Sequence, residues 1–285
     1  MVFDSELGWV YKPNLKINDF SKDQSLSTNL LGYRNQFEFS PSHNNIVFLL
    51  GDSFVFGDES SNEEVSSYLL NSNSKKHKFY NLGVSGYGHD QMLVTFERYV
   101  EKYKPVRTIL FFNFTDLHRN ILSFHDYFKP YYTWEDDLLL HTSHIVSREQ
   151  AISDEFWRLK FLEFIPIMLM RRNYNSKEYN KNIEFITSKI LERMLTVANN
   201  NNSKLNIIYI PIAHEANAVE AKEFGSEKFM FSFCKQNNIE CSSARAAFRK
   251  IKNDSGHIFK EQGHWREQGH RAVYETVRRI MGPDQ

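Results

Sequence analysis

Three polar residues from two distant stretches of the chain have the types that nucleophilic catalysis requires. Ser53 lies in the turn Gly51-Asp52-Ser53-Phe54, directly after the apolar run 46–50, and Glu261 and His264 lie in a glycine-containing loop before the last predicted helix. A serine nucleophile needs a base that takes its proton and a group that orients this base. We therefore predict Ser53 as the nucleophile, His264 as the base and Glu261 as the orienting carboxylate.

An acyl-transfer site also needs hydrogen-bond donors for the oxyanion that develops during the reaction. The backbone N–H groups of Ser53 and of Gly86, in the glycine-rich turn 83–88, are candidates. A side chain after the third predicted strand would complete this oxyanion hole, and Thr115 is a candidate there. Asn113 is the alternative donor at this place, and three polar residues are candidates for supporting the site: Asp52, Asn113 and Asp116.

Each of these residues also has a purely structural explanation. Asp52 and Ser53 are of the types that commonly cap turns without taking part in chemistry. His264 is one of 11 histidines and could be a partly buried loop residue, with Glu261 a solvated charge. His270, at the start of the last predicted helix, is expected to pack or to cap there.

The stretches between these residues alternate between strand-like and helix-like patterns, which predicts an α/β fold. Buried strands are predicted at five apolar runs: 46–50, 79–84, 107–114, 205–212 and 239–241. Helices are predicted at six stretches: 63–70, 90–103, 182–198, 216–236, 242–252 and 267–281. We therefore predict a central parallel sheet of about five strands, whose carboxyl ends bring the polar turns to one edge.

Two regions lie outside this alternation. Residues 1–44 contain isolated aromatic side chains but little periodicity, and we interpret them as an extended strap that packs across the domain. Residues 117–180 form a long, aromatic-rich insertion, helical over 156–170, that we expect to shape the substrate pocket. Because no repeat or linker divides the chain, we predict a single domain over residues 1–285.

The composition argues against a polyanionic partner and against a membrane span. Basic and acidic residues both number 35 and the pI is about 7.2, so bulk charge predicts no nucleic-acid partner. The longest apolar stretch, 161–170, contains Glu163 and Pro166 and is too short to cross a bilayer. Since the amino terminus also lacks the pattern of a signal peptide, we expect a cytoplasmic protein.

No cofactor and no metal are predicted. His125, His141 and His144 lie in the insertion without the carboxylate pattern of a metal site. Cys234 and Cys241 likewise lack metal-site spacing. We expect these cysteines to be two free buried thiols rather than a disulfide.

Taken together, the ordered motifs resemble those of the SGNH/GDSL hydrolase family. Gly51-Asp52-Ser53-Phe54 resembles its first motif, Asn81-Leu82-Gly83-Val84-Ser85-Gly86-Tyr87-Gly88 its second, and Glu261-Gln262-Gly263-His264-Trp265 its last. The approach from Leu7-Gly8-Trp9 to Gly32-Tyr33-Arg34 is similar to the leader of bacterial members. Two positions depart from the pattern: Thr115 replaces the usual asparagine of the third motif, and Glu261 replaces the usual aspartate of the last.

The resemblance implies a three-layer, flavodoxin-like α/β fold and a serine esterase that works through an acyl-enzyme on Ser53. In this reading the Ser53 and Gly86 amides and Thr115 hold the oxyanion. The substrates that it implies are acyl or acetyl esters, often on carbohydrates, so the expected partner is a small-molecule or glycan ester. Two alternatives remain open: an O-acyltransferase on the same scaffold, and a catalytically degenerate glycan-binding module suggested by Thr115 and Glu261. The sequence predicts no oligomeric state.

Overall fold

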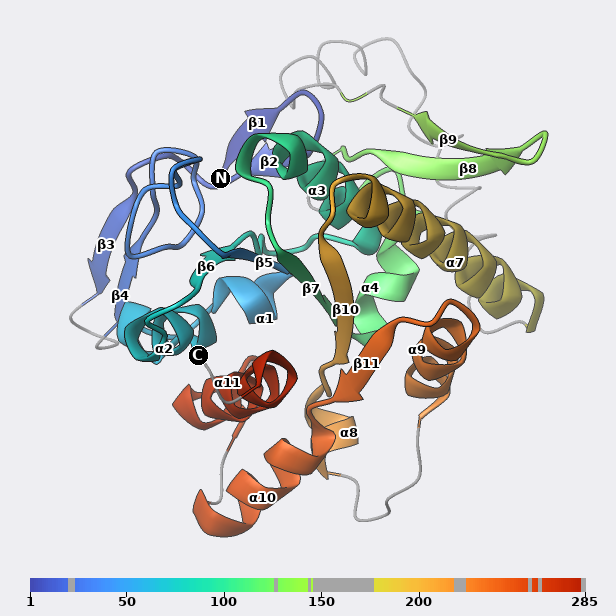
Figure 1. Ribbon diagram of the computed structural model, residues 1–285. Helices are drawn as coiled ribbons and strands as arrows, with labels where there is room; N and C mark the ends of the chain where they lie inside the picture. The colour runs from blue at the N-terminus through green and yellow to red at the C-terminus, as the bar shows by residue number, and fades with distance from the viewer. Residues whose placement is uncertain are drawn as a thin grey trace, which may run out of the picture.

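A five-stranded parallel sheet lies at the centre of the molecule (Figure 1). In order along the sheet its strands are β6 (Lys78–Asn81), β5 (Ile46–Leu50), β7 (Arg107–Phe112), β10 (Lys204–Tyr209) and β11 (Glu240–Ser243). Every neighbouring pair runs parallel. In chain order these strands are arranged 2-1-3-4-5, which is the flavodoxin-like order. The predicted α/β fold with about five parallel strands is confirmed.

The structure, a computed structural model, describes residues 1–19, 24–125, 128–142, 145, 177–217, 224–255, 258–260 and 263–282. Three subjects of the predictions lie outside these residues: the helix over 156–170, the metal candidate His144 and the carboxylate Glu261.

The central strand β5 illustrates why the apolar runs form buried strands. All five of its side chains are buried, and they alternate between two hydrophobic clusters. Ile46, Phe48 and Leu50 pack on one face of the sheet, and Val47 and Leu49 pack on the other. A parallel strand that is covered on both faces reads as a continuous apolar run, because no side of it meets water.

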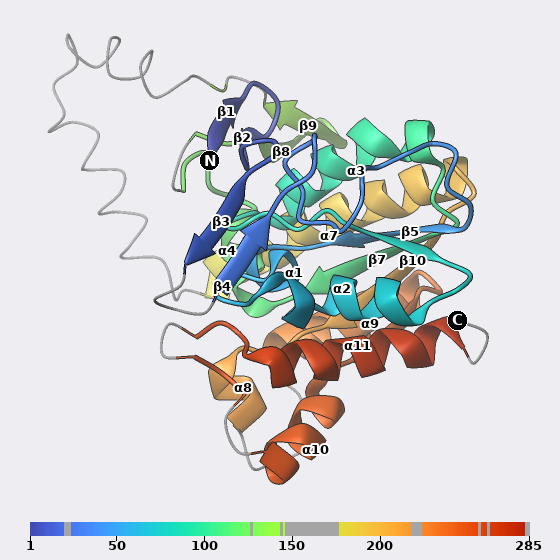
Figure 2. The same ribbon diagram turned by 90° about the vertical axis from the view of Figure 1, so that its left-hand side faces the viewer.

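Helices cover both faces of the sheet (Figure 2). One cluster includes side chains of α3 (His89–Tyr103), α7 (Lys177–Asn200) and α9 (Gly225–Gln236). The other includes side chains of α2 (Ser66–Asn73), α8 (Ala213–Asn217), α10 (Arg245–Ser255) and α11 (Glu267–Met281). The predicted stretch 216–236 is therefore divided between α8 and α9. Among the described residues, no helix is both long enough and apolar enough to cross a membrane.

Residues 1–44 contain two short hairpins where an extended strap was expected. Each hairpin is antiparallel: β1 (Val2–Asp4) with β2 (Gly8–Val10), and β3 (Lys16–Asp19) with β4 (Gln24–Ser27). Trp9 and Tyr33 belong to the core cluster on the α3 side of the sheet. Figure 2 shows both hairpins at the end of the sheet toward which β7 points.

The described part of residues 117–180 contains a hairpin that the sequence pattern did not predict. The chain leaves β7 through α4 (Phe114–Arg119), and β8 (Tyr131–Glu135) then pairs antiparallel with β9 (Leu138–Thr142). The two turn residues, Asp136 and Asp137, both have positive φ, as a type I′ hairpin turn requires. The acidic run 135–137 lacks the asparagine or glycine that is usual in such a turn, so the sequence pattern did not indicate a hairpin.

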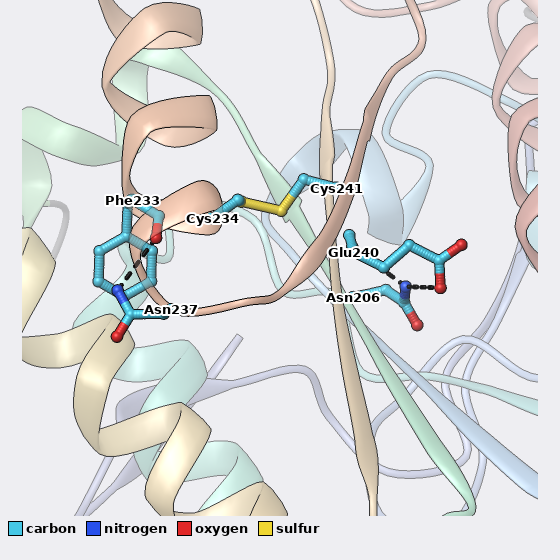
Figure 3. Close-up of a disulfide and its surroundings, with 6 residues drawn as sticks. All are labelled: Asn206, Phe233, Cys234, Asn237, Glu240 and Cys241. Atoms are coloured by element: carbon cyan, nitrogen blue, oxygen red, sulfur yellow. Dashed lines mark hydrogen bonds between the residues drawn. A yellow bond between two sulfur atoms is a disulfide. The ribbon is translucent and has the colours of Figure 1, made fainter.

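Cys234 and Cys241 form a disulfide, so the expectation of two free thiols was wrong (Figure 3). The bond joins the last turn of α9 to β11, and the two Cα atoms are 6.2 Å apart, a usual distance for a disulfide. The chain reverses between the two cysteines at Asn238, whose φ is 54°. Figure 3 also shows Asn237, whose side-chain amide donates to the Phe233 carbonyl at 3.0 Å and closes the end of α9. The seven-residue spacing alone does not indicate this reversal.

Candidate active site

The carboxyl ends of β5 and β7 lie where the strand order reverses. From β5 the chain goes to β6 on one side and then crosses to β7 on the other. In open α/β sheets, ligands bind at such a switch point. Ser53 follows β5 and Asn113 follows β7, so the nucleophile and oxyanion-hole candidates of these two strands meet there.

Ser53 begins the one-turn helix α1 (Ser53–Phe56) directly after the buried strand. Asp52 caps this helix, because its carboxylate accepts the N–H of Phe54 at 3.0 Å. Ser53 is 7% exposed, so it is buried but still partly accessible to solvent. The structure therefore places Ser53 as predicted, in the turn that directly follows a buried strand.

His264 lies within hydrogen-bond distance of the Ser53 hydroxyl. Its Nε2 is 3.0 Å from Ser53 Oγ, and its Nδ1 is 3.1 Å from Oε2 of Glu59. A carboxylate only accepts hydrogen bonds, so Nδ1 carries a proton and Nε2 can accept the proton of the hydroxyl. The side chains of His264 and Glu59 are 25% and 23% exposed. Hydroxyl, imidazole and carboxylate thus stand in the order that an activated serine requires.

Glu59 reaches His264 because the loop after α1 folds back. Gly57 ends α1 with a φ of 88°, and Glu59 itself has a φ of 63°. Buried Arg34 fastens this loop by donating to the carbonyls of Gly57 at 2.5 Å and of Ser60 at 2.6 Å. Burial lowers the pKa of Arg34 to about 10, so its guanidinium stays charged at neutral pH.

Glu59 is a candidate site residue that the sequence did not predict. It stands in the polar stretch Gly57-Asp58-Glu59-Ser60, close behind the predicted nucleophile, and no spacing rule distinguishes it from its neighbour Asp58. The backbone distinguishes them: Asp58 accepts a hydrogen bond from the Ser85 hydroxyl at 2.6 Å, whereas Glu59 faces His264. The carboxylate that was predicted for this role, Glu261, lies outside the described residues.

The segment that carries His264 is a narrow loop between α10 and α11. Phe259 and Trp265 face each other across it as an antiparallel bridge, and Lys260 N–H donates to the His264 carbonyl at 2.8 Å. His270 is 1% exposed and packs edge-on against Trp265, with 5.3 Å between ring centroids. His270 therefore packs in the core, as expected, and burial lowers its pKa to about 3.

Gly86 lies in a tight turn that is tied to the end of α1. The turn runs from Val84 to Tyr87 and is closed by a hydrogen bond from Tyr87 N–H to the Val84 carbonyl at 3.2 Å. Gly86 has a φ of 83°, which identifies a type II turn, in which the third residue needs positive φ. The Ser85 hydroxyl donates to Asp58 and so connects this turn to the loop of Glu59.

The three predicted oxyanion donors differ in their hydrogen bonds. In the part of the chain that the structure describes, neither the Ser53 N–H nor the Gly86 N–H donates to another backbone or side-chain acceptor. The Thr115 hydroxyl, however, donates to Oδ1 of Asn113 at 2.5 Å. Asn113 Nδ2 in turn donates to two buried carboxylates. The backbone N–H groups of Ser53 and Gly86 are thus available to an oxyanion, whereas the side-chain donors of Thr115 and Asn113 already donate to other protein groups.

A buried polar network joins the three loops that carry these residues. Asn113 Nδ2 donates to Asp52 at 3.2 Å and to Asp116 at 3.0 Å. Arg119 donates to the same two carboxylates, at 3.1 and 2.6 Å, and to the Tyr87 carbonyl at 2.9 Å. Burial raises the pKa of Asp116 well above its usual range, and the nearby Asp52 carboxylate raises it further. The structure brings together all three predicted supporting residues, Asp52, Asn113 and Asp116.

Among the described residues, no three histidine, cysteine, aspartate or glutamate side chains gather as ligands of a metal would. Of the histidines that were considered for such a site, His141 packs against the Tyr132 ring within the β8–β9 hairpin.

Comparison with known proteins relates the chain to solved structures only. No protein-family model and no curated protein matches its sequence. A putative lipolytic protein of the G-D-S-L family from Desulfitobacterium hafniense is similar, with 16% identity, a TM-score of 0.46 and coverage of 83% of this chain and 99% of that chain. The esterase EstA from Pseudoalteromonas sp. is 10% identical, with a TM-score of 0.45 and coverage of 84% and 99%. The acetyl xylan esterase AlAXEase is 12% identical, with a TM-score of 0.48 and coverage of 81% and 97%.

The solved structures to which the chain is similar thus include GDSL lipolytic proteins and esterases, the family whose motifs its sequence resembles. At these identities and TM-scores the similarity does not assign a reaction or a substrate to this chain.

Proposed function

We propose that the chain is a serine ester hydrolase in which Ser53 is the nucleophile, His264 the general base and then the general acid, and Glu59 the group that orients the imidazole. The observation that carries the proposal is the continuous set of contacts from Ser53 Oγ to His264 Nε2, at 3.0 Å, and from His264 Nδ1 to Glu59, at 3.1 Å. Its location at the switch point of the sheet agrees with that role.

The reaction follows from these contacts. Ser53 Oγ attacks the ester carbonyl carbon while its proton passes to His264 Nε2. When the tetrahedral intermediate collapses, the bond to the alcohol oxygen breaks, and the alcohol leaves with the proton of His264. Water then attacks the acyl-enzyme, gives a proton to Nε2 and releases the acid, and the proton returns to Ser53.

For the oxyanion we assign two donors, the N–H groups of Ser53 and Gly86. Thr115 is assigned to holding Asn113, because its hydroxyl hydrogen is donated there. An oxyanion-hole donor contributes roughly a hundredfold or more to the rate. An enzyme with two such donors is therefore expected to be slower than one with three, if all else is equal.

The substrate class comes from the motif resemblance, which implies acyl or acetyl esters, often on carbohydrates. The test should therefore span acyl length, with p-nitrophenyl acetate, butyrate and octanoate, and should include acetylated xylo-oligosaccharides. Transfer of the acyl group to an added glycan, in competition with water, would place the chain among acyltransferases instead.

The experiment that tests the function compares the parent chain with Ser53→Ala and with Ser72→Ala, a control at an exposed serine of α2. We expect a fluorophosphonate probe to label the parent and the control at Ser53, as mapped by peptide mass spectrometry, and not to label Ser53→Ala. Ester turnover by Ser53→Ala should fall at least roughly ten-thousandfold. Turnover that survives in this variant, or a folded parent that the probe never labels, would contradict the proposal and favour a binding module.

A further inference from the structure

We infer that Trp9, in the amino-terminal β1–β2 hairpin, is a positioning residue of the oxyanion hole: its indole N–H sets the direction of the Gly86 N–H. The inference rests on the proposed function and names a residue for which the sequence motifs provide no role. Trp9 is 1% exposed, and its Nε1 donates to the Ser85 carbonyl at 3.0 Å, across 76 residues of sequence.

The link from Trp9 to Gly86 is one peptide group. The Ser85 carbonyl and the Gly86 N–H belong to the same planar, trans peptide, so the C=O and N–H bonds point in opposite directions. An indole that holds the carbonyl oxygen on one side therefore aims the N–H to the other side. No other atom needs to move for this coupling, because the peptide plane is rigid.

The turn type gives this peptide two possible orientations. Ser85 and Gly86 are the two central residues of the turn from Val84 to Tyr87. Type I and type II turns differ mainly in the orientation of the peptide between their central residues, which is reversed between the two types. Gly86, with its φ of 83°, is in the type II state. A flip to type I would replace the N–H by a carbonyl oxygen, which repels an oxyanion.

Several further contacts hold the Ser85–Gly86 peptide in this state. The Ser85 hydroxyl donates to Asp58 at 2.6 Å and lies 2.6 Å from the Tyr11 hydroxyl. Trp9 is itself held in place: the Tyr87 hydroxyl donates to its carbonyl at 2.5 Å, and the two rings meet edge-on at 5.5 Å. The carbonyl and the hydroxyl of Ser85 are thus held by side chains of the amino-terminal segment and of the loop that carries Glu59.

The direct test is Trp9→Phe, which keeps an aromatic ring in the core and removes the N–H donor. We expect kcat to fall roughly tenfold to a hundredfold, the order of a weakened oxyanion donor, with little change in KM. The second-order rate of fluorophosphonate labelling of Ser53 should fall by a similar factor, because the phosphonyl oxygen occupies the same hole.

A matched control separates positioning from stability. Tyr80→Phe removes a buried hydroxyl that binds residues 1–44 to the sheet, because the hydrogen bonds of this hydroxyl go to Ser40 and His43 and not to the turn at Gly86. We expect this variant to lower the unfolding midpoint while leaving kcat and the labelling rate unchanged. If Trp9→Phe does not fold, benzothienylalanine at position 9 supplies a ring of nearly the same shape without the N–H.

The outcomes distinguish the two proposals. A folded Trp9 variant with the kcat and labelling rate of the parent would overturn the role of Trp9, although Ser53 would remain the nucleophile. A parent chain that the probe never labels would overturn the proposed function, and this inference with it. A selective loss of kcat and labelling in the Trp9 variants, absent from Tyr80→Phe, is the supporting result.

Discussion

The His264 imidazole lies between two groups that one short segment of the chain supplies. Ser53 begins α1 and Glu59 follows its end, so the proposed nucleophile and the proposed orienting carboxylate are carried by the same helical turn and its loop. The proposed base, His264, comes from a distant part of the chain. The relative position of hydroxyl and carboxylate is therefore set locally, by the cap at Asp52 and the loop that Arg34 fastens.

Glu59→Gln tests the orienting role at the residue scale. Glutamine can still accept a hydrogen bond from Nδ1, but it lacks the charge that stabilises the imidazolium in the transition state. We expect kcat to fall by roughly a hundredfold to ten-thousandfold, with KM nearly unchanged. Steady-state kinetics on p-nitrophenyl acetate would measure it.

The matched control for this variant is Glu63→Gln, at an exposed glutamate of the following 3-10 helix, for which the parent rate is expected. Parent-like kinetics in Glu59→Gln would remove Glu59 from the mechanism. A large loss in Glu261→Gln alone would return the orienting role to the carboxylate that the sequence predicts.

The positions of Ser53, Gly86 and His264 could be predicted because each residue stands in a local pattern with a physical meaning, whereas their catalytic roles stay proposals. A serine directly after a buried apolar run must lie at a sheet edge, and a Gly-rich turn after the next strand must lie near it. The partner of Nδ1 could not be predicted, because it depends on backbone dihedrals of one loop. The engagement of Thr115 with Asn113 was equally invisible, since both residues are plausible donors until their hydrogen bonds are known.

At the scale of elements, the disulfide fastens the edge strand β11 to α9. Among the strands that the structure describes, β11 pairs with β10 alone, so within this described part it has strand partners on one side only. In the sheet register Cys241 is level with Leu50, the last residue of β5, but β10 and β7 lie between β11 and β5, the strand that Ser53 follows. The disulfide should therefore affect stability more than catalysis.

The double variant Cys234→Ser/Cys241→Ser tests this division. The loop that the disulfide closes is short, so chain entropy predicts a loss of about 2 kcal/mol in the free energy of unfolding. Urea unfolding would measure it, and dithiothreitol should lower the stability of the parent by a similar amount without affecting the variant. If the parent and the double variant are equally stable, the disulfide does not stabilise the edge strand. If kcat falls in the double variant, the disulfide influences the candidate active site as well.

Elements with an unbroken pattern were predicted closely. β5 has the expected bounds, 46–50, and α11 has the expected bounds, 267–281, because an apolar run and an amphipathic repeat persist over their whole length. The β8–β9 hairpin was not predicted because its turn, Asp136-Asp137, has positive φ at two successive residues and lacks the glycine or asparagine that usually indicates this.

At the scale of the whole molecule, two buried histidines make stability depend on pH. Burial lowers the pKa of His89 and of His270 to about 3, whereas an unfolded histidine titrates near its model value of 6.5. The unfolded chain therefore binds protons that the folded chain excludes between these two values. Stability is fully present above pH 6.5 and is lost as the pH falls toward 3.

His270→Leu tests this linkage. Between pH 7.5 and pH 5.0, one such histidine costs the parent roughly 2 kcal/mol, at about 1.4 kcal/mol per pH unit below 6.5. We expect the variant to lose that much less stability than the parent over the same interval, as measured by urea unfolding at both pH values. His214→Leu, at an exposed histidine of α8, should keep the acid sensitivity of the parent. Parallel pH profiles for parent and His270→Leu would contradict the assignment.

The turn at Gly86 also gives the site a handedness requirement. The φ of Gly86 is 83°, in the left-handed region of backbone conformation. A D-amino acid would adopt this conformation without strain, whereas L-residues rarely adopt it. Of the twenty encoded amino acids, only the achiral one meets this requirement at no cost. The proposed oxyanion donor is thus the backbone N–H of a residue whose φ disfavours every L-side chain on grounds of chirality alone.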